Sequence, residues 1–140
     1  MKALTYTIKH DIKGLACSID SVLSAIQSEH VMNDQIKFEI KVVLNELIVN
    51  AICHGNNFDQ DKDTCVTIKL MKDDYLYISV KDQGCGCNGK MDLNSLDNYV
   101  REKNDMLCEH GRGLFIVEQL CDRVKFNRCG NKISIIKYLH

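Results

Sequence analysis

The sequence predicts an α+β fold, a two-layer α/β sandwich whose helices cover one face of a mixed, mostly antiparallel sheet. Alternating apolar and polar residues mark short strands near both ends and in the middle of the chain. Apolar residues at helical spacing mark the segments between them, so strands and helices are segregated in the order β, α, α, β, β, loop, α, β, β. At 140 residues the chain is the size of one domain, and residues 1–140 are expected to form a single one.

The N-terminal part is expected to contain an edge strand and a helix. Leu4, Tyr6 and Ile8 alternate with polar residues, which predicts the strand. Asp11 can cap the helix that follows. Its apolar positions are Ile12, Leu15, Ala16, Ile19, Leu23 and Ile26.

A second helix is expected to begin at Asn33 or Asp34, either of which can serve as its cap. Gly55 or a neighbouring Asn is expected to end this helix in the left-handed conformation. The apolar stripe of the helix consists of Ile36, Ile40, Val43, Leu44, Leu47, Ile48 and Ala51.

The C-terminal part is expected to be an antiparallel hairpin, a long loop, a helix and two closing strands. Residues 65–71 and 75–81 alternate around a short polar turn, which predicts the hairpin. Residues 83–110 show little periodicity and are expected to form a functional lid with a short helix at 93–103. Helical spacing resumes at residues 113–120, and strands are expected at 123–128 and 132–139.

Composition excludes several classes of protein. A formal net charge of −1 without a basic block argues against direct nucleic-acid binding. No apolar run approaches the ~20 residues of a membrane span, and residues 1–8 do not resemble a signal peptide, so a cytoplasmic domain is expected. The eight cysteines permit a disulfide framework, but the missing secretory context favours free thiols.

The first motif with chemical content lies on the second helix. Glu46, Asn50 and His54 are each four residues apart and line one side of it. Glu46 has two interpretations, a solvated helix residue or a general base that deprotonates a hydroxyl group. Asn50 offers a neutral oxygen that could bind Mg²⁺, a cation that prefers oxygen ligands.

The second motif ends the hairpin, where Asp82 precedes Gly84 and Gly86. Asp at a strand end is commonly a turn residue. Glycines nevertheless let a ligand approach the backbone closely, and a carboxylate there could accept a hydrogen bond from an exocyclic amine such as that of adenine.

The third motif, Gly111-Arg112-Gly113, is expected to precede a helix. A plain glycine turn is one interpretation. The other is a phosphate site, because the free N–H groups of a helix start bind phosphate and Arg112 can add a charge-assisted contact. Together the three motifs supply the groups that an ATP site needs.

Cysteines and histidines flank the expected lid. Cys85, Cys87, Cys108 and His110 could bind Zn²⁺, although one-residue spacing within each pair is tighter than usual, and incidental free thiols are the favoured interpretation. The other histidines, His10, His30 and His140, are expected at the surface.

In combination, the motifs resemble the N, G1 and G2 boxes of the GHKL ATP-binding superfamily, which includes gyrase and the histidine kinases. The matching residues are Glu46-x-x-x-Asn50-Ala51-x-x-His54-Gly55, Asp82-x-Gly84-x-Gly86 and Gly111-Arg112-Gly113-Leu114. The Asn-Ala-x-x-His-Gly form and the single-domain size are similar to the bacterial anti-sigma factor kinases of stress response and sporulation. The resemblance covers about the whole chain.

The resemblance implies a Bergerat-type fold that binds ATP and Mg²⁺ beneath a lid at about residues 83–110. It implies that Glu46 is the catalytic base and Asn50 the Mg²⁺ ligand. The implied nucleotide-binding residues are Asn50, Asp82, Gly84, Gly86, Gly111, Arg112, Gly113 and Leu114.

The implied activity is transfer of the γ-phosphoryl group of ATP to a Ser or Thr of a small anti-anti-sigma protein of the STAS type. The implied partner is a sigma factor, which a homodimer sequesters. Cys85 and Cys87 depart from the family pattern, which more often has an apolar or aromatic residue and a nearby proline. Two alternatives stay open: a non-catalytic, ATP-dependent protein-binding switch and a small free-standing ATPase.

Overall fold

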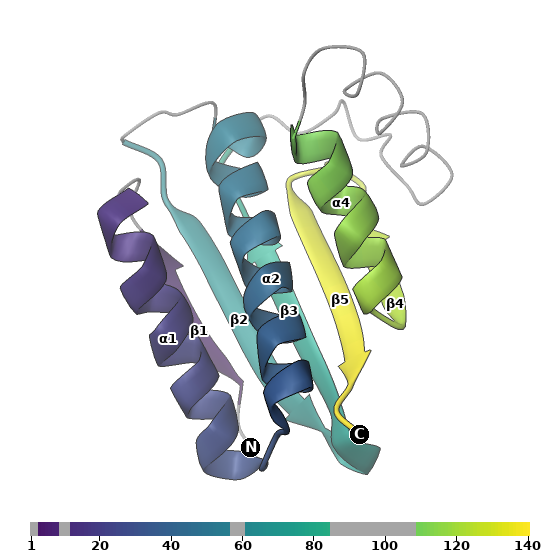
Figure 1. Ribbon diagram of the computed structural model, residues 1–140. Coiled ribbons are helices and arrows are strands. Elements are labelled where there is room, and N and C mark those ends of the chain that lie inside the picture. The colour runs from purple at the N-terminus through teal and green to yellow at the C-terminus, as the bar shows by residue number, and fades with distance from the viewer. Residues whose placement is uncertain (1–2, 9–11, 57–60, 85–108) are drawn as a thin grey trace.

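The computed structural model describes residues 3–8, 12–56, 61–84 and 109–140. In this part of the chain a five-stranded sheet has the spatial order β1-β2-β3-β5-β4. The helices all lie on one face of the sheet (Figure 1). The strands are β1 (Leu4–Ile8), β2 (Thr64–Met71), β3 (Tyr75–Lys81), β4 (Arg123–Phe126) and β5 (Lys132–Tyr138), and the helices are α1 (Ile12–Glu29), α2 (Asp34–Asn50) and α4 (Glu109–Leu120).

Every strand pair within these residues is antiparallel. The predicted α+β sandwich is therefore confirmed, with a sheet that is antiparallel throughout its described strands. β1 is an edge strand as predicted, and β2 and β3 form the predicted hairpin. The hairpin turn is a short 3₁₀ segment, Lys72–Asp74, in which Asp73 and Asp74 both have a φ of 63°. Asp tolerates this left-handed region better than most residues.

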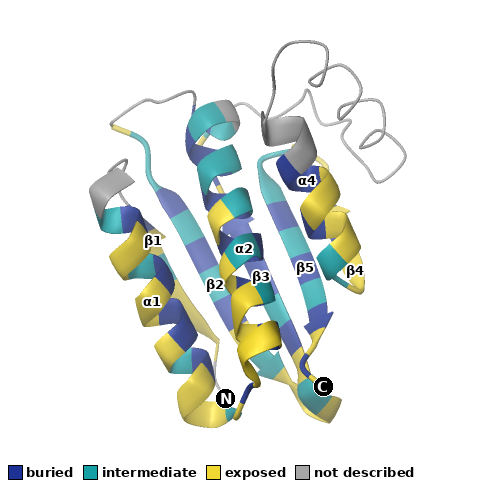
Figure 2. Cartoon of the chain, viewed as in Figure 1, coloured by how far each residue is buried: buried dark blue, intermediate teal, exposed yellow. Residues whose placement is uncertain are grey.

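The core lies between the helices and the sheet, where the buried faces of both layers meet (Figure 2). Every predicted stripe residue of α2 is buried, and burying one such aliphatic side chain contributes about 1.5–3 kcal/mol. The prediction for α1 was wrong at one position, because Ala16 is exposed whereas Val22 is fully buried. Val22 follows Leu15 by seven residues and therefore shares its face, whereas Ala16 lies about 100° around the helix.

One of the buried side chains is that of a charged lysine. Lys137 on β5 is 5 % exposed; its Nζ donates a hydrogen bond of 2.6 Å to the carbonyl oxygen of Leu120 and lies 3.0 Å from Glu39 Oε2. The cation thus sits at the C-terminal end of α4, where the helix dipole favours positive charge. It links β5, α4 and α2, so α4 is fixed relative to α2 at this end.

Two helix ends differ from the predictions. Asn33 is the cap of α2, accepting a 2.8 Å bond from Ile36 N–H. After Asn50 the chain continues as a π-helical turn, Ala51–Gly55, closed by a 2.7 Å bond from Asn56 N–H to Ala51 O. Asn56 has a φ of −85° and Gly55 has no positive φ, so the predicted left-handed ending at these two residues was wrong. The wider π turn replaces it.

The helix α4 begins at Glu109, four residues before Gly113, where the sequence predicted its start. Gly111, Arg112 and Gly113 are therefore inside its first turns instead of preceding it. The first N–H groups of a helix lack intrahelical partners, and those of α4 lie in its first turn, which begins at Glu109. The described part of the chain contains no helix that is long and apolar enough to cross a membrane.

Candidate functional site

The three predicted motifs meet at one end of the sandwich. The C-terminal end of α2, the end of β3 and the start of α4 all lie at the top of the molecule in Figure 1. The first element carries Glu46 and Asn50, the second is followed by Asp82 and Gly84, and the third carries Gly113. Tertiary packing of helices against the sheet thus brings together residues that are far apart in the sequence.

Asp82 and Gly84 pack directly against Gly55, which ends the π turn. A methyl group on Gly55 would overlap the Asp82 carboxylate, and one on Gly84 would overlap the backbone carbonyl of Gly55. The π turn and the segment after β3 therefore approach so closely that neither glycine has room for a Cβ atom. Replacing Gly55 with alanine would force the Asp82 carboxylate to move, and replacing Gly84 would force the backbone at Gly55 to move.

The carboxylate of Asp82 is buried, with 7 % of the residue exposed. Its Oδ1 accepts a 2.8 Å hydrogen bond from Gly84 N–H, which fixes its orientation. Burial raises the pKa of Asp82 above its usual value, an effect that the Gly84 N–H and the positive charge of Lys62 partly offset. A buried, oriented carboxylate of this kind suits recognition of a hydrogen-bond donor on a ligand.

Glu46 lies against the start of α4. A methyl group on Gly113 would overlap Glu46 Oε2, so glycine is what lets α4 come this close to the carboxylate. Glu46 is half-buried and also lines a cavity of about 440 Å³ between α1 and α2, together with Leu15, Ile19 and Val42. The carboxylate is thus held between Gly113 of α4 and a cavity, which is a suitable position for a general base.

Asn50 supplies a second chemical group, one turn beyond Glu46. Its Oδ1 is buried and has no hydrogen-bond partner in the part of the chain that the structure describes. A buried amide oxygen without a partner costs about 1–3 kcal/mol, and such a cost is often retained at functional sites. Neutral oxygen is a ligand that Mg²⁺ prefers, so Asn50 fits the metal-binding role that the sequence predicts.

Leu114 has a different place from the other predicted residues. Its side chain is 2 % exposed and belongs to the core beneath α4. A contribution of Leu114 to a ligand site would therefore come from its backbone.

Several predicted residues lie outside the described part of the chain. These are His10, the predicted helix cap Asp11, Gly86, the thiols Cys85, Cys87 and Cys108, most of the predicted lid at 83–110 and the short helix at 93–103. The side chains of His54, His110 and Arg112 are also outside it, although their backbones are described as helical. The five cysteines that are described, Cys17, Cys53, Cys65, Cys121 and Cys129, are free.

Asn56 is a positioning residue that sequence reasoning took only for a helix end. It is 2 % exposed. Its Nδ2 donates to Asp63 O at 3.0 Å and to Thr64 Oγ1 at 3.2 Å, and its Oδ1 accepts from Gln83 N–H at 2.7 Å. One side chain therefore joins the end of the helical segment to β2 and to the residue after Asp82. A polar residue directly after the glycine of the motif was the available signal.

Comparison with known proteins adds family information to this geometry. The family model for the histidine kinase-like ATPase domain matches residues 15–137. The chain is 31 % identical over 101 residues to serine-protein kinase RsbW of Staphylococcus epidermidis, covering 71 % of this chain and 64 % of the relative. The identity to RsbW of Bacillus subtilis is 30 % over 105 residues, covering 73 % and 64 %.

A third relative is the anti-sigma F factor of Shouchella clausii, 31 % identical over 87 residues, which cover 62 % of this chain and 57 % of the relative. The chain thus spans less than two thirds of the length of the relatives that it matches.

Replacing Asn56 tests its positioning role. Asn56→Ala removes three hydrogen bonds and leaves the Gln83 N–H without its acceptor, so the free energy of unfolding is expected to fall by about 2–4 kcal/mol. Denaturant unfolding measures this change. Asn45→Ala, at an exposed position of α2, is the matched control and should change it by no more than about 0.5 kcal/mol. Equal effects of the two substitutions would contradict the role.

Proposed function

The chain belongs to the histidine kinase-like ATPase domain family, and from this we propose that it is an ATP-dependent serine/threonine protein kinase that also acts as an anti-sigma factor. Its sandwich is the Bergerat-type fold of that family, and the family implies ATP binding. The observation that carries the kinase activity is the position of the Glu46 carboxylate against the first turns of α4. An ATP-binding clamp would need no base at this point.

The nucleotide is proposed to lie across the three motifs. Asp82 accepts a hydrogen bond from the adenine amine, and Gly84 and Gly86 allow the base and ribose to approach the backbone. The start of α4, which carries Gly111, Arg112, Gly113 and Leu114, is proposed to hold the phosphates through the free N–H groups of its first turn and a charge-assisted contact of Arg112. The burial of Asp82 and the close approach at Gly84 support this placement.

In the proposed reaction Glu46 accepts the proton of a serine or threonine hydroxyl group. The oxygen of that hydroxyl then bonds to the γ-phosphorus, the bond from this phosphorus to the bridging oxygen breaks, and ADP leaves. Asn50 would hold Mg²⁺ through its Oδ1, and the ion would neutralise phosphate charge. The α4 start stabilises the charge on the transferred group, so catalysis rests on positioning and electrostatics.

The proposed protein partners follow from the names of the relatives. Two of those relatives are named serine-protein kinases and one is named an anti-sigma factor. We therefore propose that this chain phosphorylates a small anti-anti-sigma protein, sequesters a sigma factor and works as a homodimer. The competing functions are a non-catalytic ATP-dependent switch and a free-standing ATPase.

Glu46→Gln tests the kinase proposal. Removing the base should lower phosphoryl transfer to the anti-anti-sigma partner by about 10²–10⁴-fold. ATP affinity should stay within a few-fold of wild type. Transfer is measured with labelled ATP, and affinity by calorimetry.

The matched control is Glu118→Gln on the exposed side of α4, which should keep wild-type transfer. Unchanged transfer in Glu46→Gln would contradict the role of Glu46. A wild-type protein that binds ATP without transferring phosphate would support the switch, and partner-independent hydrolysis alone would support the ATPase.

Asn50→Ala tests the proposed metal ligand. Calorimetric ATP titrations of wild type should show tighter binding with Mg²⁺ than with a chelator, and the variant should lose this difference. Because Asn50 Oδ1 has no partner among the described residues, the metal-free variant should lose no more than about 1 kcal/mol of unfolding free energy. An intact Mg²⁺ effect in the variant would exclude Asn50 as a ligand.

The raised pKa of Asp82 predicts a pH dependence of ATP binding. The carboxylate is the proposed acceptor, so binding should weaken as the pH falls through the raised pKa. This weakening should begin at a higher pH than it would for a carboxyl group with the ordinary pKa of 3.8. Asp82→Asn should bind ATP about 10–100-fold more weakly at neutral pH and lose this titration. The same acid dependence in the variant would show that another group is responsible.

A further inference from the structure

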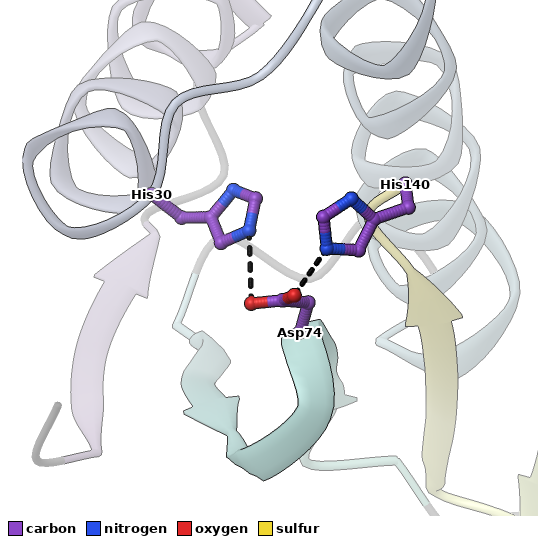
Figure 3. Close-up of side chains that lie close together, drawn as sticks. All are labelled: His30, Asp74 and His140. Carbon is purple, nitrogen blue, oxygen red and sulfur yellow. Dashed lines mark hydrogen bonds and ion pairs between the residues drawn. The ribbon is translucent and has the colours of Figure 1, made fainter.

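Three side chains of metal-ligand type converge at the end of the sandwich opposite Glu46 and Asp82. His30 follows α1, Asp74 lies in the turn between β2 and β3, and His140 follows β5 (Figure 3). The seven-residue strand β3 separates Asp74 from Asp82, which places the two ends of the sheet about 20 Å apart. The cluster is therefore separate from the proposed nucleotide site.

The side chains share a single carboxylate. His30 Nε2 lies 3.1 Å from Asp74 Oδ1, and His140 Nε2 contacts Asp74 Oδ2. The ligand atoms of the three residues all lie within 4.8 Å of one another. Ligands that bind zinc tetrahedrally at 2.0–2.1 Å are themselves about 3.3 Å apart. The three residues are thus close to the spacing that a bound ion requires.

The backbone holds these residues in place without an ion. The carbonyl oxygen of Asp74 accepts a 3.0 Å bond from Leu139 N–H, which sets the next residue, His140, beside the turn. His30 N–H donates a 2.9 Å bond to Ile26 O, so His30 continues the last turn of α1. His30, expected at the surface, is half-buried, with 15 % of its side chain exposed; His140 is exposed as expected.

We propose that His30, Asp74 and His140 bind a divalent transition-metal ion, with Zn²⁺ the best match to their chemistry. Two imidazole nitrogens and one carboxylate oxygen suit zinc, whereas Mg²⁺ and Ca²⁺ prefer oxygen ligands alone. Three protein ligands leave a fourth position for water. The bound ion fastens the end of α1, the hairpin turn and the segment after β5 to one another.

The surroundings of His30 limit the affinity of this site. Its Nδ1 is buried and has no hydrogen-bond partner among the described residues, so Nε2 is the nitrogen that faces the other two ligands. A ligating imidazole usually donates its other N–H to an acceptor, and a missing acceptor commonly costs 10–100-fold in metal affinity. The site should therefore bind more weakly than a structural zinc centre.

The test uses the whole chain without a histidine tag, freed of metal by a chelator and free of nucleotide. Zn²⁺ alone is added, and its stoichiometry and the midpoint of thermal unfolding are measured. Wild type should bind one ion at this site and unfold at a higher temperature with Zn²⁺, because a ligand that binds only the folded state stabilises it. Asp74→Asn and His140→Gln should lose that ion and most of the Zn²⁺-dependent shift.

Asp73→Asn is the matched control, because Asp73 is the neighbouring exposed residue of the same turn and has the same φ of 63°. It should keep the wild-type response to Zn²⁺. Both Asn variants tolerate this conformation, so their metal-free unfolding temperatures separate a lost ligand from a damaged turn.

Cobalt(II) distinguishes this site from zinc binding by thiols. Ions bound by imidazole and carboxylate give no sulfur-to-metal charge-transfer absorption, whereas thiolate-bound cobalt does. The proposal is supported if the cobalt spectrum of wild type lacks this charge-transfer absorption and the whole cobalt spectrum is lost in Asp74→Asn. Thiolate absorption that is the same in both proteins overturns it, and so does an equal Zn²⁺ response in Asp74→Asn and wild type.

Discussion

The candidate site depends on contacts in which a glycine backbone lies against a carboxylate with no room for a methyl group. Gly55 takes this position against Asp82, and Gly113 takes it against Glu46. Each contact joins two elements, the first the helical segment to the end of β3, and the second α2 to α4. The distances between the motifs therefore depend on the missing Cβ atoms of these glycines as much as on attractive contacts.

The sheet and its turns keep these contacts in register. Asp82 N–H donates a 2.9 Å bond to Asn131 O, so the turn between β4 and β5 fixes the end of β3. Asn56 fixes the same region from the other side through Gln83 N–H. At the far end of α4, Lys137 holds the helix end near α2. The carboxylates are therefore placed by the whole fold instead of by their own loops.

The sequence predicted the features that depend on local pattern. The buried stripe of α2, the hairpin and the cap at Asn33 follow from periodicity and side-chain chemistry, and all three were confirmed. The start of α4 was placed four residues late, because glycine ordinarily disfavours a helix interior. Gly113 nevertheless lies inside the helix, and its contact with Glu46, which leaves no room for a Cβ atom, is the tertiary reason for a glycine at this position.

Non-local contacts were also beyond sequence reasoning at Asn56 and His30, whose partners lie on other elements. Five of the predicted site residues lie together at one end of the sandwich; they are Glu46, Asn50, Asp82, Gly84 and Gly113. Motif order predicted this grouping, whereas the π turn that adjusts the end of α2 has no signal in the sequence pattern.

A crystal structure of the chain with a non-hydrolysable ATP analogue and Mg²⁺ tests the central claim, that the three motifs form one nucleotide site. The account predicts the adenine amine within hydrogen-bond distance of the Asp82 carboxylate and Asn50 Oδ1 among the Mg²⁺ ligands. It also predicts the phosphates at the start of α4. A nucleotide bound elsewhere, or one whose base does not reach Asp82, would contradict it.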